Sequence, residues 1–334
     1  MNRIKVFSVL LYLFVFPLVL TAQKKYSFNH QQMGTQIRLV FYAPDSADAD
    51  TVAKLVFKRI DDLNAVLSDY LPQSELNRLC ETVNSKVKVS KDLFQILKLS
   101  VGVSEKTDGA FDVSMGPVIA LWKNARKKGT LPTDQEIQLA KKKTGFGKIE
   151  FFEDDVVRLK DSGMQLDLGG IGKGYTADKA IVLLKELGVK SALVDMGGDV
   201  TVSGAPPDKE YWVLGFSYYD LNGAEVFTKL NLKNQAVATS GDLYQYFIMD
   251  GKRYSHIVDP KTGRALSNNI QVTTIAPNGT MADAYASALS VIGVENGKKL
   301  QNKIPGLEVF MVADLPGTYQ KWKSPKFNYY ILND

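Results

Sequence analysis

Residues 167–175 have the sequence Asp-Leu-Gly-Gly-Ile-Gly-Lys-Gly-Tyr, in which four glycines fall within six positions. The pattern of residues 172–188 predicts a helix that starts in this stretch and stops at a glycine. Backbone N–H groups at such a helix start can approach a phosphate closely, and the helix dipole favours an anion there. The spacing matches neither the P-loop nor the GxGxxG pattern, and a tight turn that needs positive φ is the plain alternative. Asp167 and Lys173, which flank the glycines, favour a ligand site.

The segments on both sides of this stretch have helix-like and strand-like patterns without strict βαβ alternation. This arrangement predicts an α+β fold with mixed or mostly antiparallel sheets flanked by helices. The prediction depends on helices over 48–70, 172–188 and 281–293, helix N-caps at Ser90 and Thr133, strands over 37–41, 191–195 and 272–276, and mostly strands over 212–257 with a two-residue turn at Asp250-Gly251.

The composition excludes several classes of protein. The chain has 334 residues, of which 45% are hydrophobic and 23% charged, so disorder, a collagen-like fibre and a polytopic membrane protein are excluded. The formal net charge is +5, and no stripe of Lys and Arg is interleaved with aromatic residues, so we expect no nucleic-acid partner. Cys80 is the only cysteine, which excludes an intrachain disulfide and a multi-cysteine zinc site.

The N-terminus has the layout of a secretory signal. Arg3 and Lys5 precede fifteen residues without a charge, and Ala22 is a small residue before a polar one. This predicts a signal peptide over residues 1–22 and a mature domain over 23–334. The apolar run is short of the roughly 20 residues of a membrane span, although an uncleaved anchor is the alternative. No cysteine stands directly after the apolar run, so we expect an exported, periplasmic protein without a lipid anchor at that point. An association with the inner membrane stays open.

Two further segments carry side chains suited to chemistry. Asp283 and Ser287 lie four residues apart on a predicted helix, so both oxygens face one side, and a carboxylate with a hydroxyl suits Mg²⁺. The alternative is a local hydrogen bond or an acid favoured by the helix dipole. His256 is followed by Asp259 at a strand-to-turn junction, which could form an acid–base element. The alternative is a structural histidine and an Asp-Pro turn.

Taken in chain order, the motifs of this sequence resemble those of the FAD:protein FMN transferases, the ApbE family. The resemblance spans about residues 30–315, and the set of motifs in register is specific although each alone is weak. The matching segments are Met33-Gly34-Thr35, Tyr70 with Ser74-Glu75-Leu76-Asn77, Gly109-Ala110-Phe111-Asp112 with Gly116-Pro117 and Leu121-Trp122, residues 167–175, Gly197-Gly198-Asp199, Thr239-Ser240-Gly241-Asp242, residues 255–263, and Ala282-Asp283-Ala284 with Ser287.

The resemblance implies an ApbE (T-fold-like) architecture and a reaction. Such proteins transfer FMN from FAD to a threonine hydroxyl of a partner flavoprotein in a Mg²⁺-dependent step that releases AMP. The implied FAD site consists of Met33, Tyr70, Ala110, Phe111, Asp112, Asp167, Lys173 and Ile257. The implied Mg²⁺ ligands are the Gly170 carbonyl, the Asp283 carboxylate and the Ser287 hydroxyl, where relatives usually have threonine. The implied partners are threonine-containing acceptor subunits of extracytoplasmic electron-transfer flavoproteins, such as those of sodium-pumping NADH:quinone reductases and Rnf-type complexes.

The attacking hydroxyl must lose a proton, and His256 is our candidate general base, with Asp259 as its orienter or as an alternative base. Three other functions stay open at this point. The protein could be an FAD pyrophosphatase that gives FMN and AMP, a non-enzymatic periplasmic FAD-binding protein, or an unrelated exported α+β protein whose glycine turns are only structural.

Overall fold

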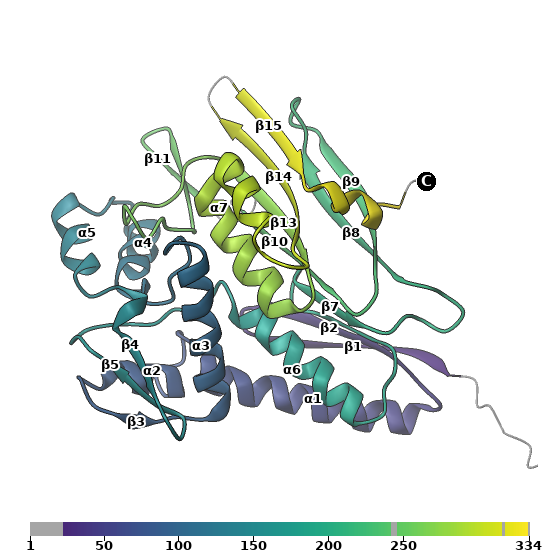
Figure 1. Cartoon of the computed structure of the whole chain (residues 1–334). Helices are drawn as coiled ribbons and strands as arrows, with labels where there is room; N and C mark the ends of the chain where they lie inside the picture. Colours follow the sequence, from purple (N-terminus) through teal and green to yellow (C-terminus); the bar gives the residue numbers. More distant parts are fainter. Residues whose placement is uncertain (1–22, 242–245, 316–317, 333–334) are drawn as a thin grey trace, which may run out of the picture.

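A computed structural model describes residues 23–241, 246–315 and 318–332 of the chain (Figure 1). The predicted signal peptide, residues 1–22, lies outside the described residues. The largest element is an eight-stranded sheet in which all the neighbouring strands pair antiparallel. In spatial order its strands are β1 (Lys24–Gln32), β2 (Thr35–Ala43), β6 (Ala192–Asp195), β7 (Val200–Ser203), β10 (Ala236–Gly241), β13 (Ile270–Ala276), β14 (Glu308–Leu315) and β15 (Thr318–Lys323).

This sheet is covered on both faces. Helices α1 (Ser46–Leu67), α6 (Gly172–Glu186) and α7 (Gly279–Gln301) pack on one face, and the hairpin of β8 (Trp212–Tyr219) and β9 (Glu225–Leu232) packs on the other, with η2 (Pro325–Tyr330). Along β2, Leu39 and Phe41 belong to the core under the helices, whereas Val40 belongs to the core under the hairpin. The alternation follows from the two-residue period of a strand.

A group of smaller elements lies beside the helical face of the sheet (Figure 1). It contains α2 (Glu75–Glu81), α3 (Lys91–Lys106), α4 (Gly116–Lys128), α5 (Asp134–Lys141), η1 (Phe146–Lys148), a sheet of β3 (Val87–Lys88), β5 (Val156–Leu159) and β4 (Ile149–Phe152), and the hairpin of β11 (Tyr246–Met249) and β12 (Lys252–Ser255). One hydrophobic core joins α3 of this group to α7 and to β10 and β13 of the large sheet.

The predicted α+β class with mostly antiparallel sheets is confirmed, and so are the local signals. Ser90 caps α3 by accepting a hydrogen bond from the Leu93 N–H (3.3 Å), and Thr133 begins α5 with a complete capping box. Asp250 and Gly251 both have positive φ, as a two-residue turn between β11 and β12 requires. The predicted end of the last long helix at Gly293 is confirmed, because this residue has φ +75° and ψ 175°, which interrupts the helix; a second helical segment follows, and the two together make up α7.

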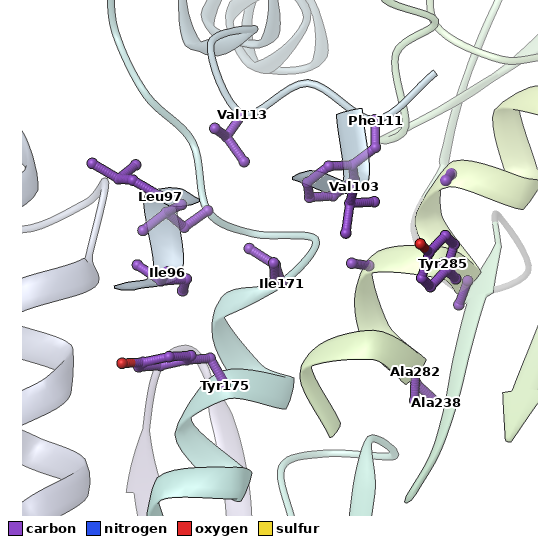
Figure 2. Packing of buried hydrophobic residues seen from close by; sticks show 14 of the residues in the cluster. Ile96, Leu97, Val103, Phe111, Val113, Ile171, Tyr175, Ala238, Ala282 and Tyr285 are labelled. Carbon is purple, nitrogen blue, oxygen red and sulfur yellow. The ribbon is translucent and has the colours of Figure 1, made fainter. Parts of the chain in front are cut away.

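Two glycines allow α6 and α7 to touch. A Cβ added at Gly174 would overlap the Gly279 carbonyl oxygen and lie 2.9 Å from Asp283 Cβ. Asp178 of α6 strengthens the contact, because its carboxylate accepts hydrogen bonds from the Gly279 N–H (2.6 Å) and from the N–H (2.8 Å) and hydroxyl (2.6 Å) of Thr280. Figure 2 shows the core around this contact, with Ile171 and Tyr175 on the α6 side and Ala282 and Tyr285 on α7. The start of α7 is therefore fixed against the start of α6.

Replacing Gly174 with alanine tests this contact. The added methyl group must push the two helices apart, so we expect Gly174→Ala to lower the free energy of unfolding in urea by about 1–3 kcal/mol. Gly102→Ala in α3 is the matched control, because a Cβ there meets no atom within 4 Å. It should leave the free energy unchanged or raise it by up to about 1 kcal/mol. Equal values for the two variants would contradict the close approach.

Candidate active site

A cavity of about 720 Å³ lies where the glycine turn, α4, the segment after α1 and the end of β12 meet. Its lining includes all eight residues of the predicted FAD site, namely Met33, Tyr70, Ala110, Phe111, Asp112, Asp167, Lys173 and Ile257, together with His256, Gly170 and Ser287. The chain thus brings together residues that are up to 254 positions apart, from Met33 to Ser287 (287 − 33). A cavity of this size is in the range of ligand and cofactor sites.

The glycine turn is shaped by Asp167 and by its neighbours. One Asp167 oxygen, Oδ1, accepts a hydrogen bond from the Gly169 N–H (2.9 Å), and the Asp167 N–H donates to the Val113 carbonyl (2.7 Å). A Cβ at Gly170 would lie 2.9 Å from Ser287 Oγ and 3.3 Å from Phe111 Cε2. The turn, α7 and the segment around Phe111 are therefore in direct contact.

Asp283 lies behind the turn and does not line the cavity itself. The residue is 5% exposed, and its Oδ2 accepts a hydrogen bond from the Gly174 N–H (3.0 Å). Burial and the nearby Asp199 raise the pKa of Asp283 to about 7. Ser287, one turn further along α7, reaches the turn at Gly170. A cation would stabilise the ionised form of the Asp283 carboxylate. The Gly170 carbonyl, the Asp283 carboxylate and the Ser287 hydroxyl are all oxygen ligands of the kind that Mg²⁺ prefers.

Lys173 is the cation that interacts with both Asp283 and Asp199. It forms an ion pair with Asp199, which is 6% exposed and was missed as a site residue although it ends the Gly197-Gly198-Asp199 motif. Burial lowers the pKa of Lys173, but the carboxylates of Asp199 and Asp283 outweigh this and hold the pKa above its ordinary value. Lys173 is therefore charged at neutral pH and lies at the start of α6, where the helix dipole adds to its effect.

A second lysine in the wall, Lys123, was also missed. Its Nζ is 2.8 Å from Asp69 Oδ2, 3.2 Å from Asp167 Oδ2 and 4.4 Å from the centre of the Tyr70 ring. Burial and the charge of Asp167 raise the pKa of Asp69. Lys123 follows the Leu121-Trp122 motif directly, which was the one available signal. Because Tyr70 is 75% exposed, its ring is available to an aromatic ligand.

The remaining predicted residues divide between the cavity and the loops around it. His256 is exposed and lines the cavity. Asp259 does not line it, and its carboxylate accepts hydrogen bonds from the Lys261 N–H (2.8 Å) and the Thr262 hydroxyl (2.9 Å) of its own turn. The Asp112 carboxylate accepts from the Ser114 N–H and hydroxyl and the Phe146 N–H, and burial raises its pKa. Asp242 lies outside the described residues.

Two features are absent from residues 23–241, 246–315 and 318–332. No group of three or more His, Cys, Asp and Glu side chains is placed to hold a metal ion, so a metal here would depend on carbonyl and hydroxyl oxygens as well. In the same ranges, no helix has the length and apolar character needed to cross a bilayer.

The sequence model of the ApbE family matches residues 33–311. The chain belongs to the ApbE family. Its curated relatives include the FAD:protein FMN transferase of Escherichia coli K12, 28% identical with 90% of this chain and 88% of the relative covered, and one from Klebsiella pneumoniae, 32% identical with 81% and 84% covered. The predicted family membership is confirmed, and this ApbE chain is a member of a family of flavinyl transferase enzymes.

Solved ApbE structures have the same fold as this ApbE chain. The flavin transferase ApbE from Vibrio cholerae superposes with a TM-score of 0.85 at 26% identity, covering 92% of this chain and all of the other. The ApbE protein from Thermotoga maritima has a TM-score of 0.81 at 30% identity, with 93% and 100% covered.

Lys123 offers a test of the cavity wall. In Lys123→Met the carboxylates of Asp69 and Asp167 lose their shared cation and repel each other, and the Tyr70 ring loses its cation. We expect the dissociation constant for FAD, measured by quenching of flavin fluorescence, to rise about tenfold. Lys123→Arg should stay close to wild type. Lys127→Met, at an exposed position of the same helix, is the control, and an equal loss of affinity there would argue against a specific role for Lys123.

Proposed function

We propose that this chain transfers FMN from FAD to a threonine hydroxyl of an acceptor flavoprotein and releases AMP. The observation that carries the proposal is the single cavity in which the predicted FAD residues surround the glycine turn, with Asp283 and Ser287 against that turn. The names of the curated relatives support the same activity.

In the proposed step, the acceptor oxygen attacks the phosphorus of the FMN half of FAD. The bond between this phosphorus and the bridging oxygen breaks, and AMP leaves with the bridging oxygen. The hydroxyl proton passes to the imidazole of His256. Because phosphoryl transfer depends on positioning and on neutralisation of charge, the N–H groups of the glycine turn and the ammonium group of Lys173 would bind and orient the diphosphate.

We propose that the Gly170 carbonyl, Asp283 and Ser287 hold Mg²⁺. When bound, this ion would offset the charge of the diphosphate and of the departing AMP. The donor set fits, because Ser287 contacts Gly170, and because burial and Asp199 raise the pKa of the Asp283 carboxylate, which a cation would reverse. We also propose that the protein acts in the periplasm after removal of residues 1–22, on extracytoplasmic acceptors.

The direct test incubates residues 23–334 with FAD, Mg²⁺ and the purified extracytoplasmic domain of a flavin-carrying subunit of a sodium-pumping NADH:quinone reductase. We expect a fluorescent acceptor band on a denaturing gel, an equal amount of AMP, and loss of both in excess EDTA. AMP and free FMN without a labelled acceptor would instead identify an FAD pyrophosphatase. FAD that binds but stays intact would identify a binding protein.

Asp283→Ala removes the one charged group of the proposed metal site. We expect turnover to fall at least about 100-fold while the melting temperature changes little, because the group lies where α6 and α7 begin rather than in the apolar core. Ser287→Ala removes a proposed ligand and should raise the Mg²⁺ concentration needed for half-maximal turnover. Ser287→Thr keeps the hydroxyl and should need the same Mg²⁺ concentration as the wild-type protein. Asp50→Ala, at an exposed position of α1, is the control. Normal turnover of Asp283→Ala would disprove this metal site.

His256→Ala separates a base from a residue that shapes the cavity. If His256 accepts the proton, kcat should fall about 100-fold or more while the dissociation constant for FAD stays within about twofold. The measurement is transfer at saturating FAD together with a binding titration. A variant that keeps its kcat but loses FAD affinity would instead assign His256 to binding.

A further inference from the structure

A second cavity, of about 520 Å³, lies on the opposite face of the large sheet, under the hairpin β8–β9. The sheet contributes Val40, Leu193 and Val237 to its lining, and the hairpin contributes Trp212 and Phe216. These side chains are buried parts of the core between the sheet and the hairpin. The cavity is thus apolar at its base, as ligand sites usually are, and no step of the proposed chemistry uses it.

The turn over residues 195–199 separates this cavity from the proposed diphosphate site. Asp195 and Gly198 line the second cavity, whereas Asp199 pairs with Lys173, which lines the first. A Cβ added at Gly198 would meet no atom within 4 Å, so the turn is open on this side. A molecule in the second cavity would therefore lie one turn of backbone away from the reacting phosphates.

Strand β10 extends the cavity past that turn. Val237 pairs with Val200, the first residue of β7, and the two strands run antiparallel, so Thr239 and Gly241 lie beyond the start of β7. Both line the cavity, and Thr239 is exposed there. Within the described part of that motif, residues 239–241, no residue lines the first cavity.

A buried amide in this cavity is incompletely bonded. Gln271 is 3% exposed, and its side-chain Nε2 donates a hydrogen bond to the Ser217 carbonyl of β8 (2.7 Å), which fixes the amide. Its Oε1 accepts no hydrogen bond from any residue of the described ranges. Because an unpaired buried oxygen is costly, a ligand with an N–H or O–H donor would be stabilised at this site.

The rim of the cavity is positively charged. Arg38 of β2 and Lys25 of β1 both line it. Arg38 is 3.4 Å from Asp195, a long and exposed ion pair, and Lys25 forms no ion pair with a residue that the structure describes. An acidic group on a partner would therefore meet a complementary charge at this edge.

We propose that this second cavity binds an extended segment of the acceptor protein beside the hydroxyl that receives FMN. An apolar side chain of that segment fills the base, an N–H group donates to Gln271 Oε1, and an acidic residue faces Lys25 and Arg38. The proposal rests on the proposed transferase function, because a transferase needs a site for its second substrate next to the first. The feature of the cavity that favours a polypeptide is the unpaired oxygen of the Gln271 amide, because a polypeptide backbone supplies N–H groups.

Two variants test the cavity without touching the first one. Thr239→Tyr places a ring in the opening, and Lys25→Glu reverses the charge of the rim. Lys24→Glu is the matched control, because neighbouring residues of a strand point to opposite faces and Lys24 does not line the cavity. Each protein is assayed for FAD affinity, for FMN transfer to the acceptor domain named above, and for binding of the fluorescently labelled acceptor domain without FAD.

We expect both cavity variants to raise the KM for the acceptor at least about tenfold and to weaken its binding equally, with wild-type FAD affinity. The Lys24→Glu control should match wild type. Normal transfer by both variants would overturn the acceptor site and leave the transferase function standing. Acceptor binding that only the cavity variants lose, without transfer by any protein, would support the site and contradict the function. An acceptor that neither binds to the wild-type protein nor receives FMN would contradict both.

Discussion

The close contact between α6 and α7 is the constraint on which the site depends. Gly174 and Gly279 leave no room for a Cβ, and the Asp178 carboxylate binds the first two residues of α7. Because α6 begins at the glycine turn, this contact also sets where Asp283 and Ser287 meet that turn. A shift of one helix by the width of a methyl group would break the hydrogen bond that the Asp283 carboxylate accepts from the Gly174 N–H.

Charge balance in the cavity follows from the same packing. Asp199 and Asp283 are both buried, and only Lys173 stands between them among the described residues, so one carboxylate is left without a full counter-charge. Asp69 and Asp167 similarly share Lys123. An excess of buried acid is costly unless a cation joins it, which is the physical reason for proposing Mg²⁺ at this place. The two lysines then serve different ends, one near the proposed phosphates and one at the Tyr70 ring.

The large sheet separates two cavities; residues of the turn over 195–199 line the second one, and Asp199 of the same turn pairs with Lys173, which lines the first. On one side of this turn Asp199 holds Lys173, and on the other Gly198 is open towards the hairpin β8–β9. An enzyme that transfers one half of a dinucleotide to a protein must bring two dissimilar substrates to one phosphorus. A short glycine-containing turn is suited to this, because its missing side chains allow backbone and ligand to approach closely.

The sequence by itself determined what depends on neighbouring residues. Helix starts at Ser90 and Thr133 and the turn at Asp250-Gly251 are encoded within four residues, and the order of the motifs was enough to identify the family. Only the tertiary structure decided what depends on distant ones. Lys123 is 54 residues from Asp69 and 44 from Asp167, so no local pattern could place their charges together. Gly293 ends a helix as its sequence predicts, but only the packing of the residues after it, including Val294 and Leu300, shows where the next helical segment lies. Local backbone chemistry is written in sequence, whereas the meeting of remote side chains is set by the packing of the whole chain.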